Sequence, residues 1–229
     1  MPTPRRIAID GPAGAGKSTV GALVAERLGY LFLDTGAMYR AVALLALRRG
    51  ISPEAEDALA EVARAANIAI GPPTVRDGRA YTVLVDGTDE TWDIRDGEVD
   101  RIVSQVARHP RVREAMVAQQ RRLGARGRVV MVGRDIGTVV LPDADLKIFL
   151  TASASERARR RGEELAARGV VRSREELFHE ILHRDRLDSE RAVAPLKAAA
   201  DAIVLETDGH TVGEALERVL QILAARSRT

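Results

Sequence analysis

The chain has 229 residues, of which 45% are hydrophobic and 30% charged, a balance that suits one large domain with a buried core. Its formal net charge is +2 and only 3% of its residues are aromatic, which excludes a polycationic nucleic-acid binder and a row of base-stacking side chains. Cysteine is absent, which excludes disulfides, thiolate zinc sites and cysteine nucleophiles.

The first predicted element is a short apolar strand at residues 7–10, followed by a glycine-rich loop and a helix at residues 19–28. The loop, residues 11–18, reads G-x-x-x-x-G-K-S, the pattern of a P-loop that binds nucleotide phosphates. Its glycines let backbone N–H groups turn toward polyphosphate oxygens, and the helix adds its positive N-terminal end. We therefore expect ATP to contact Gly11, Pro12, Ala13, Gly14, Ala15, Gly16, Lys17, Ser18 and Thr19.

Two side chains of this loop have predicted chemical roles. Lys17 is expected to reach the outer phosphates and to act in catalysis, and the Ser18 hydroxyl to hold Mg²⁺ together with the phosphates of ATP. Nearly every other cation of the chain is arginine, so a lysine at this position fits the need for a compact ammonium group.

Strands and helices then alternate at both ends of the chain. The further predictions are strands at residues 30–33, 129–132, 147–150 and 202–205, and helices at residues 36–49 and 212–225. Short apolar strands separated by amphipathic helices predict an α/β fold of three layers, with a central parallel sheet covered by helices on both faces. Ligands of such a sheet bind at the carboxyl ends of its strands.

The middle of the chain departs from this alternation. Asp-Gly turn dipeptides at Asp77 and Asp86 flank an extended stretch, which predicts a small antiparallel sheet. Helices predicted at residues 97–109 and 111–126 lead back to the main sheet. We therefore expect one P-loop domain, with a core at about 1–66 and 127–229 and a β-rich insertion at about 67–126.

Charged side chains gather at the sheet edge where the predicted strands end. Arg40 lies one turn into the helix after the second strand, and Arg134 follows the strand at residues 129–132 after one glycine, Gly133. Each arginine alone would suit a weak surface ion pair, but arginines that converge on a cleft repel one another unless an anion joins them. A phosphate monoester matches the guanidinium fork. Three further charged residues share one face of a predicted helix at i, i+4 and i+7: Arg184, Asp188 and Arg191.

Several collinear segments resemble those of the bacterial cytidylate kinases, within the nucleoside monophosphate kinase family. They are I-D-G-P-A-G-A-G-K-S-T from Ile9, L-D-T-G-A-M-Y-R from Leu33, S-Q-V-A from Ser104, P-R-V-R from Pro110, G-R-D-I-G-T-V-V from Gly133 and R-A-V-A-P-L from Arg191. The resemblance implies transfer of a phosphoryl group from ATP to CMP or dCMP by a monomer in pyrimidine nucleotide metabolism. It also implies that the insertion binds the monophosphate and that residues 155–170 form a mobile lid.

The resemblance further implies a role for each matching residue. The phosphate of the acceptor would be held by Arg40, Arg134, Arg184 and Arg191, of which the last three would also act in catalysis with Lys17. The cytosine edge would be read by Ser104, Arg113 and Asp135. Asp188 would meet the sugar hydroxyls, and the pocket would be lined by Thr35 and Tyr39. The family often has Ser in place of Thr35, and the hydroxyl is retained.

Other functions fit the sequence less well. A guanine-reading switch protein needs an Asn-Lys-x-Asp motif, but the single asparagine, Asn67, precedes Ile68. A kinase for another monophosphate or for shikimate would share the P-loop, whereas the insertion, Ser104 and Arg113 argue against it. No apolar run approaches membrane-spanning length and no signal-peptide pattern is present. We therefore expect a cytoplasmic protein with neither a membrane nor a nucleic-acid partner.

A metal pair is also conceivable on a predicted helix, where His179 and His183 are spaced i, i+4. No third ligand accompanies them in the sequence, so solvated surface residues are the better interpretation.

Overall fold

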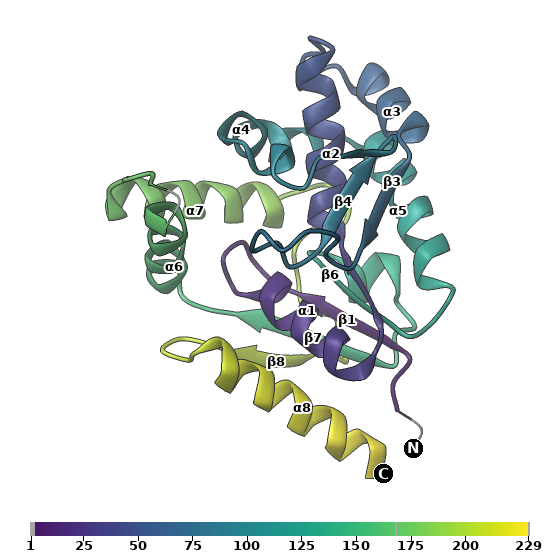
Figure 1. Ribbon diagram of the computed structural model, residues 1–229, viewed down its shortest axis with the longest axis vertical. Helices are drawn as coiled ribbons and strands as arrows, with labels where there is room; N and C mark the ends of the chain where they lie inside the picture. Colours follow the sequence, from purple (N-terminus) through teal and green to yellow (C-terminus); the bar gives the residue numbers. More distant parts are fainter. Residues whose placement is uncertain (1–2, 168, 229) are drawn as a thin grey trace.

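The computed structural model of the protein describes residues 3–167 and 169–228. Figure 1 shows a central sheet with helices on both faces and two helices projecting to one side. In chain order the elements are β1 (Arg6–Asp10), α1 (Lys17–Leu28), β2 (Leu31–Asp34), α2 (Thr35–Arg48), α3 (Glu56–Ala65), β3 (Ile68–Gly71), β4 (Thr82–Val85), β5 (Thr88–Asp89), the 3₁₀ helix η1 (Asp93–Arg95), α4 (Gly97–Val106), α5 (Pro110–Gly124), β6 (Val129–Gly133), the π-helical turn η2 (Ile136–Val140), β7 (Leu146–Thr151), α6 (Ala154–Ala167), α7 (Arg174–Ser189), β8 (Ile203–Glu206) and α8 (Val212–Arg228).

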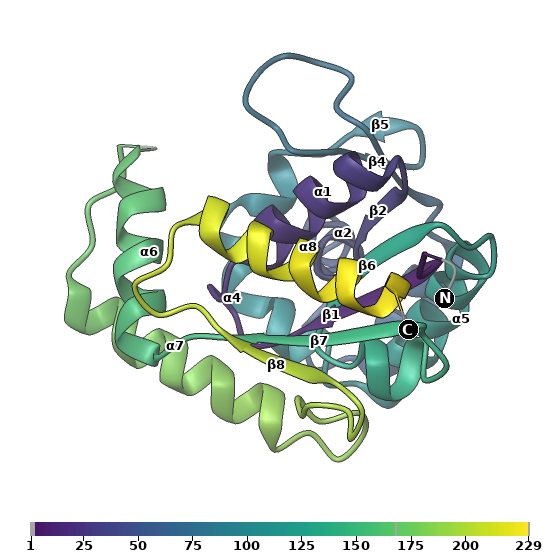
Figure 2. The same cartoon turned by 90° about the horizontal axis from the view of Figure 1, so that it is seen from below.

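The central sheet has five strands in the order β2-β6-β1-β7-β8, and all of its neighbouring strands run parallel. The β1 strand lies in the middle, and its residues alternate between the two faces. Ile7 and Ile9 pack with α1 and α8 on one face, and Ala8 packs with α2, α4 and α5 on the other. Figure 2 shows α8 running beside α1. The predicted three-layer α/β fold is confirmed.

The middle of the chain forms a second sheet of three antiparallel strands in the order β3-β4-β5. Val83 and Val85 of β4 are buried in the same apolar cluster as α2 and α5, so this sheet shares a core with one face of the main sheet. The sequence analysis did not predict α3, which packs between α2 and α5. Its apolar residues recur at helical spacing, but alanines dominate and weaken the pattern.

The projecting helices α6 and α7 pack against each other through a small apolar cluster of Ala158, Leu177 and Ile181. The serine at the start of α7 forms a capping box, in which Ser173 and Glu176 satisfy each other's backbone N–H groups. The pair stands beside the carboxyl ends of the strands (Figure 1). Charged side chains on these helices therefore reach toward the edge of the sheet where a ligand is expected.

Candidate active site

The loop between β1 and α1 has a backbone that requires glycine. Gly11, Gly14 and Gly16 have φ angles of 149°, 75° and 88°, a region that residues with a Cβ rarely enter. A Cβ atom on Gly11 would lie only 1.9 Å from the carbonyl oxygen of Leu150. The loop therefore closes tightly against the end of β7, with the N-terminus of α1 directly behind it.

Lys17 is buried at the start of α1, and its Nζ donates a hydrogen bond to the Pro12 carbonyl oxygen at 2.6 Å. Burial and the nearby guanidinium of Arg134 lower the pKa of Lys17 well below its usual value. The same Arg134 is one of the arginines predicted to hold the acceptor. The loop lysine therefore lies close enough to Arg134 to be affected by its charge.

The Ser18 hydroxyl donates a hydrogen bond to Oδ2 of Asp34, the last residue of β2, at 2.7 Å. The hydroxyl of the buried Tyr81 donates to the same oxygen at 2.9 Å. The sequence analysis assigned no role to Asp34 or Tyr81. Asp34 could have been found from its position at a strand end, whereas no local pattern points to Tyr81, which lies 47 residues away.

A pocket opens beside the loop, between α2, α4, α5, α7 and the segments after β6 and after α7. Arg191 lies beyond the end of α7 at Ser189, and not on the helix face predicted for it. It is lined by Thr35, Gly36, Tyr39, Val103, Ser104, Ala107, Arg113, Gly133, Arg134, Asp135, Arg184, Asp188 and Arg191. Every residue predicted to bind the acceptor is on this wall except Arg40. The structure therefore brings together side chains that lie up to about 150 residues apart in the sequence.

One end of the pocket holds a buried ion pair. Arg113 of α5 donates a hydrogen bond to Oδ2 of Asp135, and the two side chains are 3% and 6% exposed. The Arg113 guanidinium also lies over the Tyr39 ring, 5.6 Å from its centroid. Within the described residues, the Nε of Arg113 and the Tyr39 hydroxyl are buried without a hydrogen-bond partner. This end therefore combines a buried ion pair with an aromatic ring.

The other end is strongly cationic. Asp188 accepts a hydrogen bond from Arg134 Nε at 2.8 Å and another from Arg191. Burial raises the pKa of the Asp188 carboxyl, but these arginines outweigh burial and hold it at about 2. Burial and the neighbouring guanidiniums of Arg134 and Arg40 lower the pKa of Arg184 to about 10. On the pocket wall at this end, Asp188 stands against three arginines, Arg134, Arg184 and Arg191.

Arg40 lies behind this wall. It donates to the Ile94 carbonyl oxygen at 3.1 Å and forms an ion pair with Asp100. Thr35 is satisfied within the protein, because its hydroxyl donates to the Val132 carbonyl oxygen at 2.8 Å. Thr35 thus fastens the start of α2 to the end of β6, a role that a serine hydroxyl could also fill.

Helix α6 contacts the loop through Arg157. Arg157 is buried, donates to the Ala13 carbonyl oxygen at 3.2 Å and pairs with Asp185 of α7 at 2.9 and 2.6 Å. Arg160 instead donates to Thr207. The sequence analysis did not distinguish among the arginines of this helix, because only their packing separates them.

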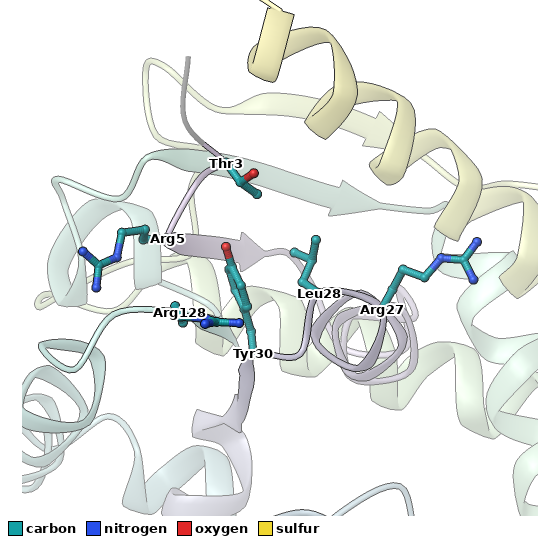
Figure 3. A pocket seen from close by; sticks show the side chains of 6 residues that line it. All are labelled: Thr3, Arg5, Arg27, Leu28, Tyr30 and Arg128. Atoms are coloured by element: carbon teal, nitrogen blue, oxygen red, sulfur yellow. The ribbon is translucent and has the colours of Figure 1, made fainter.

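A second hollow, shown in Figure 3, lies where β1 and β2 begin and is lined by Thr3, Arg5, Arg27, Leu28, Tyr30 and Arg128. Arg128 lies over the Tyr30 ring, while Arg5 and Arg27 point away from each other (Figure 3). These arginines do not converge on one point, unlike those of the first pocket. In the described chain, moreover, no three His, Cys, Asp or Glu side chains form a metal-binding group, and none of the described helices could span a bilayer.

Known proteins resemble this chain over nearly its whole length. A sequence model described as cytidylate kinase matches residues 7–225. The cytidylate kinase of Chloroflexus aggregans is 57% identical over 220 residues, covering 96% of this chain and 94% of that protein. The cytidylate kinase of Geobacillus kaustophilus is 52% identical, covering 96% of each. A solved gluconokinase from Sinorhizobium meliloti, at 18% identity and a TM-score of 0.50, covers 100% of this chain and 96% of its own and supports the fold alone.

Proposed function

The chain belongs to the cytidylate kinase family, and on that premise we propose that it transfers the γ-phosphoryl group of ATP to CMP or dCMP, giving ADP and CDP or dCDP. One observation supports the proposal: the glycine-rich loop and the arginine cluster meet at one sheet edge. Asp10, from which the P-loop starts, lies opposite Gly133 in the sheet, and Gly133 directly precedes Arg134. The backbone loop suits the donor, and the arginine cluster suits the acceptor.

The donor half uses the loop from Gly11 to Thr19, with Lys17 reaching the outer phosphates. The Ser18 hydroxyl and the Asp34 carboxylate lie 2.7 Å apart, and such hard oxygen ligands fit Mg²⁺. We assign Ser18 as the ligand that holds Mg²⁺ together with the phosphates, with Asp34 orienting the hydroxyl. When bound, the ion neutralises charge on the transferring group.

The acceptor half divides into a phosphate end and a base end. Arg134, Arg184 and Arg191 hold the phosphate, with Arg40 supporting them from behind the wall. At the base end, Asp135 accepts from the exocyclic amine of cytosine and Arg113 donates to its ring nitrogen or carbonyl, with Ser104 beside them. Uracil would turn a carbonyl toward the carboxylate, a mismatch that costs about 1–3 kcal/mol.

We assign Asp188 to the sugar hydroxyls. Its carboxylate is on the pocket wall, beside Arg134 and Arg191. Both of its oxygens accept hydrogen bonds from arginines without a ligand. The sugar therefore shares or displaces one of those bonds when the acceptor enters.

No general base is needed, because the attacking phosphate oxygen of the acceptor is already anionic at neutral pH. Catalysis then comes from alignment of the two phosphates and from neutralisation of charge by Lys17, Arg134, Arg184 and Arg191. Closure of α6 and α7 over the site would exclude water, the competing acceptor. We propose a monomer, as the resemblance to this family implies. Because ATP and CMP are metabolites of the cytoplasm, we place it there.

A coupled assay with ATP and each of CMP, dCMP, UMP and AMP tests this function. CMP and dCMP should be phosphorylated at least about fivefold more efficiently than UMP, the ratio that follows from the mismatch at Asp135. AMP should be a poor acceptor. Preference for AMP or UMP would contradict the proposal.

A further inference from the structure

Asp100 of α4 gathers arginines from three other elements around one carboxylate. It accepts hydrogen bonds from Arg40 of α2 and, at 2.7 Å, from Arg161 of α6. The Nη1 of Arg184 on α7 lies 4.0 Å from its Oδ1. Only 22% of the Asp100 side chain is exposed. Burial raises the pKa of this carboxyl, but the arginines outweigh burial and lower it below its ordinary value.

Asp100 is not on the pocket wall, and none of the segments that resemble the family includes it. Its position nevertheless bears on the phosphate end. Arg184 stands between Asp188 and Asp100, and each of these carboxylates is already hydrogen-bonded to two other arginines. The Nε of Arg184 is buried and has no hydrogen-bond partner among the described residues. Arg184 is therefore the guanidinium whose charge is balanced least.

We propose that Asp100 is a positioning residue that acts as the internal counter-anion of the phosphate end. It holds Arg40 and Arg161 beside Arg184 while the pocket is empty, and it competes with the acceptor's phosphate for the same cluster of cations. The inference rests on the proposed function, because it places the phosphate monoester at Arg184. Since Arg161 belongs to the lid, the same carboxylate also ties α6 to α4.

Because charge balance is at stake, substitutions at Asp100 and Arg161 should change the affinity for CMP in opposite directions. Asp100→Asn removes a negative charge close to where the phosphate dianion binds, so CMP should bind about three- to tenfold more tightly. Arg161→Gln removes a positive charge and leaves the carboxylate in place, so CMP should bind more weakly by a similar factor. The double variant restores the balance and should bind CMP within about twofold of the wild type.

Calorimetric titration of the full chain with CMP and with cytidine measures these effects without turnover. Cytidine lacks the phosphate, so its affinity should be the same in every variant. Glu98→Gln is the matched control, because Glu98 is an exposed residue of the same helix that pairs with Arg101; it should bind both ligands like the wild type. In steady-state assays Asp100→Asn should also lower kcat together with the KM for CMP, since Arg40 and Arg161 are no longer held.

Several results would overturn the proposal. One is weaker CMP binding by both single variants, which is expected if Asp100 only supports the fold. Another is an equal change in the affinities for cytidine and for CMP. A third is an Asp100→Asn protein that binds CMP like the wild type. Asp100→Ala provides a second neutral side chain, and it must shift CMP affinity in the same direction. If the wild type itself bound no CMP, the proposed function would fail, whereas normal wild-type binding with an unaffected Asp100→Asn variant would refute this inference alone.

Discussion

The carboxylate of Asp10 accepts a hydrogen bond from the backbone N–H of Gly137 at 2.7 Å. A second bond of 2.7 Å comes from the N–H of Ile136. Asp10 ends the strand that leads into the P-loop, and residues 136–137 follow the segment that carries Arg134 and Asp135. The two halves of the site are thus joined by one buried side chain, and a change at Asp10 should affect both.

Burial raises the pKa of Asp10 to about 6 in spite of its two N–H donors. A raised pKa means that the folded protein binds this proton more tightly than the unfolded chain does. The stabilisation is therefore present below about pH 4 and is lost as the pH rises through 6. Relative to Asp10→Asn, which does not titrate, the wild type should lose about 2–3 kcal/mol of unfolding free energy between pH 4 and pH 8.

Urea unfolding of both proteins at several pH values measures this difference. The comparison with Asp10→Asn removes the contributions of other titrating groups, since both proteins share them. A constant difference across the pH range would show that Asp10 ionises with its ordinary pKa.

Lys17→Met should lower kcat by at least about a hundredfold, because the variant loses the ammonium group that we propose reaches the outer phosphates. The fold should persist, since a methionine side chain fills a similar buried volume. Steady-state assays with circular dichroism check both points. Lys197→Met, at an exposed position, should keep full activity. Undiminished turnover in Lys17→Met would remove this residue from the site.

Asp135→Asn should raise the KM for CMP by about tenfold or more and leave the KM for ATP within about twofold. The amide can donate where the carboxylate accepted, so the preference for CMP over UMP should shrink. Initial rates with both acceptors at saturating ATP measure this. An equal rise in both KM values would instead indicate a role near Mg²⁺.

Tyr81→Phe removes one hydroxyl from the Asp34–Ser18 contact without altering packing. The unfolding free energy should fall by about 1 kcal/mol, because the buried carboxylate loses a donor. The Mg²⁺ concentration for half-maximal activity should rise by about two- to fivefold, because Asp34 would orient the Ser18 hydroxyl less well. Thermal unfolding and Mg²⁺ titrations of activity measure these two effects. A variant as stable as the wild type, with an unaltered Mg²⁺ requirement, would argue against any link from Tyr81 to Ser18.

The parts of this protein that could be predicted from sequence are those with a local cause. The P-loop follows from glycine spacing, and Arg134 and Asp135 could be placed because they directly follow an apolar strand. Contacts across the chain leave no such pattern. The pair Arg113–Asp135 spans 22 residues and the contact between Asp100 and Arg161 spans 61, and both depend on how α4, α5 and α6 pack around α2 and the sheet.

We propose that a donor site of backbone amides and an acceptor site of guanidiniums face each other across one cleft. Titration with a ligand that joins adenosine and cytidine through a chain of phosphates tests this most directly. One molecule should bind per chain, more tightly than ATP or CMP alone, and it should displace both nucleotides. Displacement of ATP only, with CMP still bound, would contradict the account.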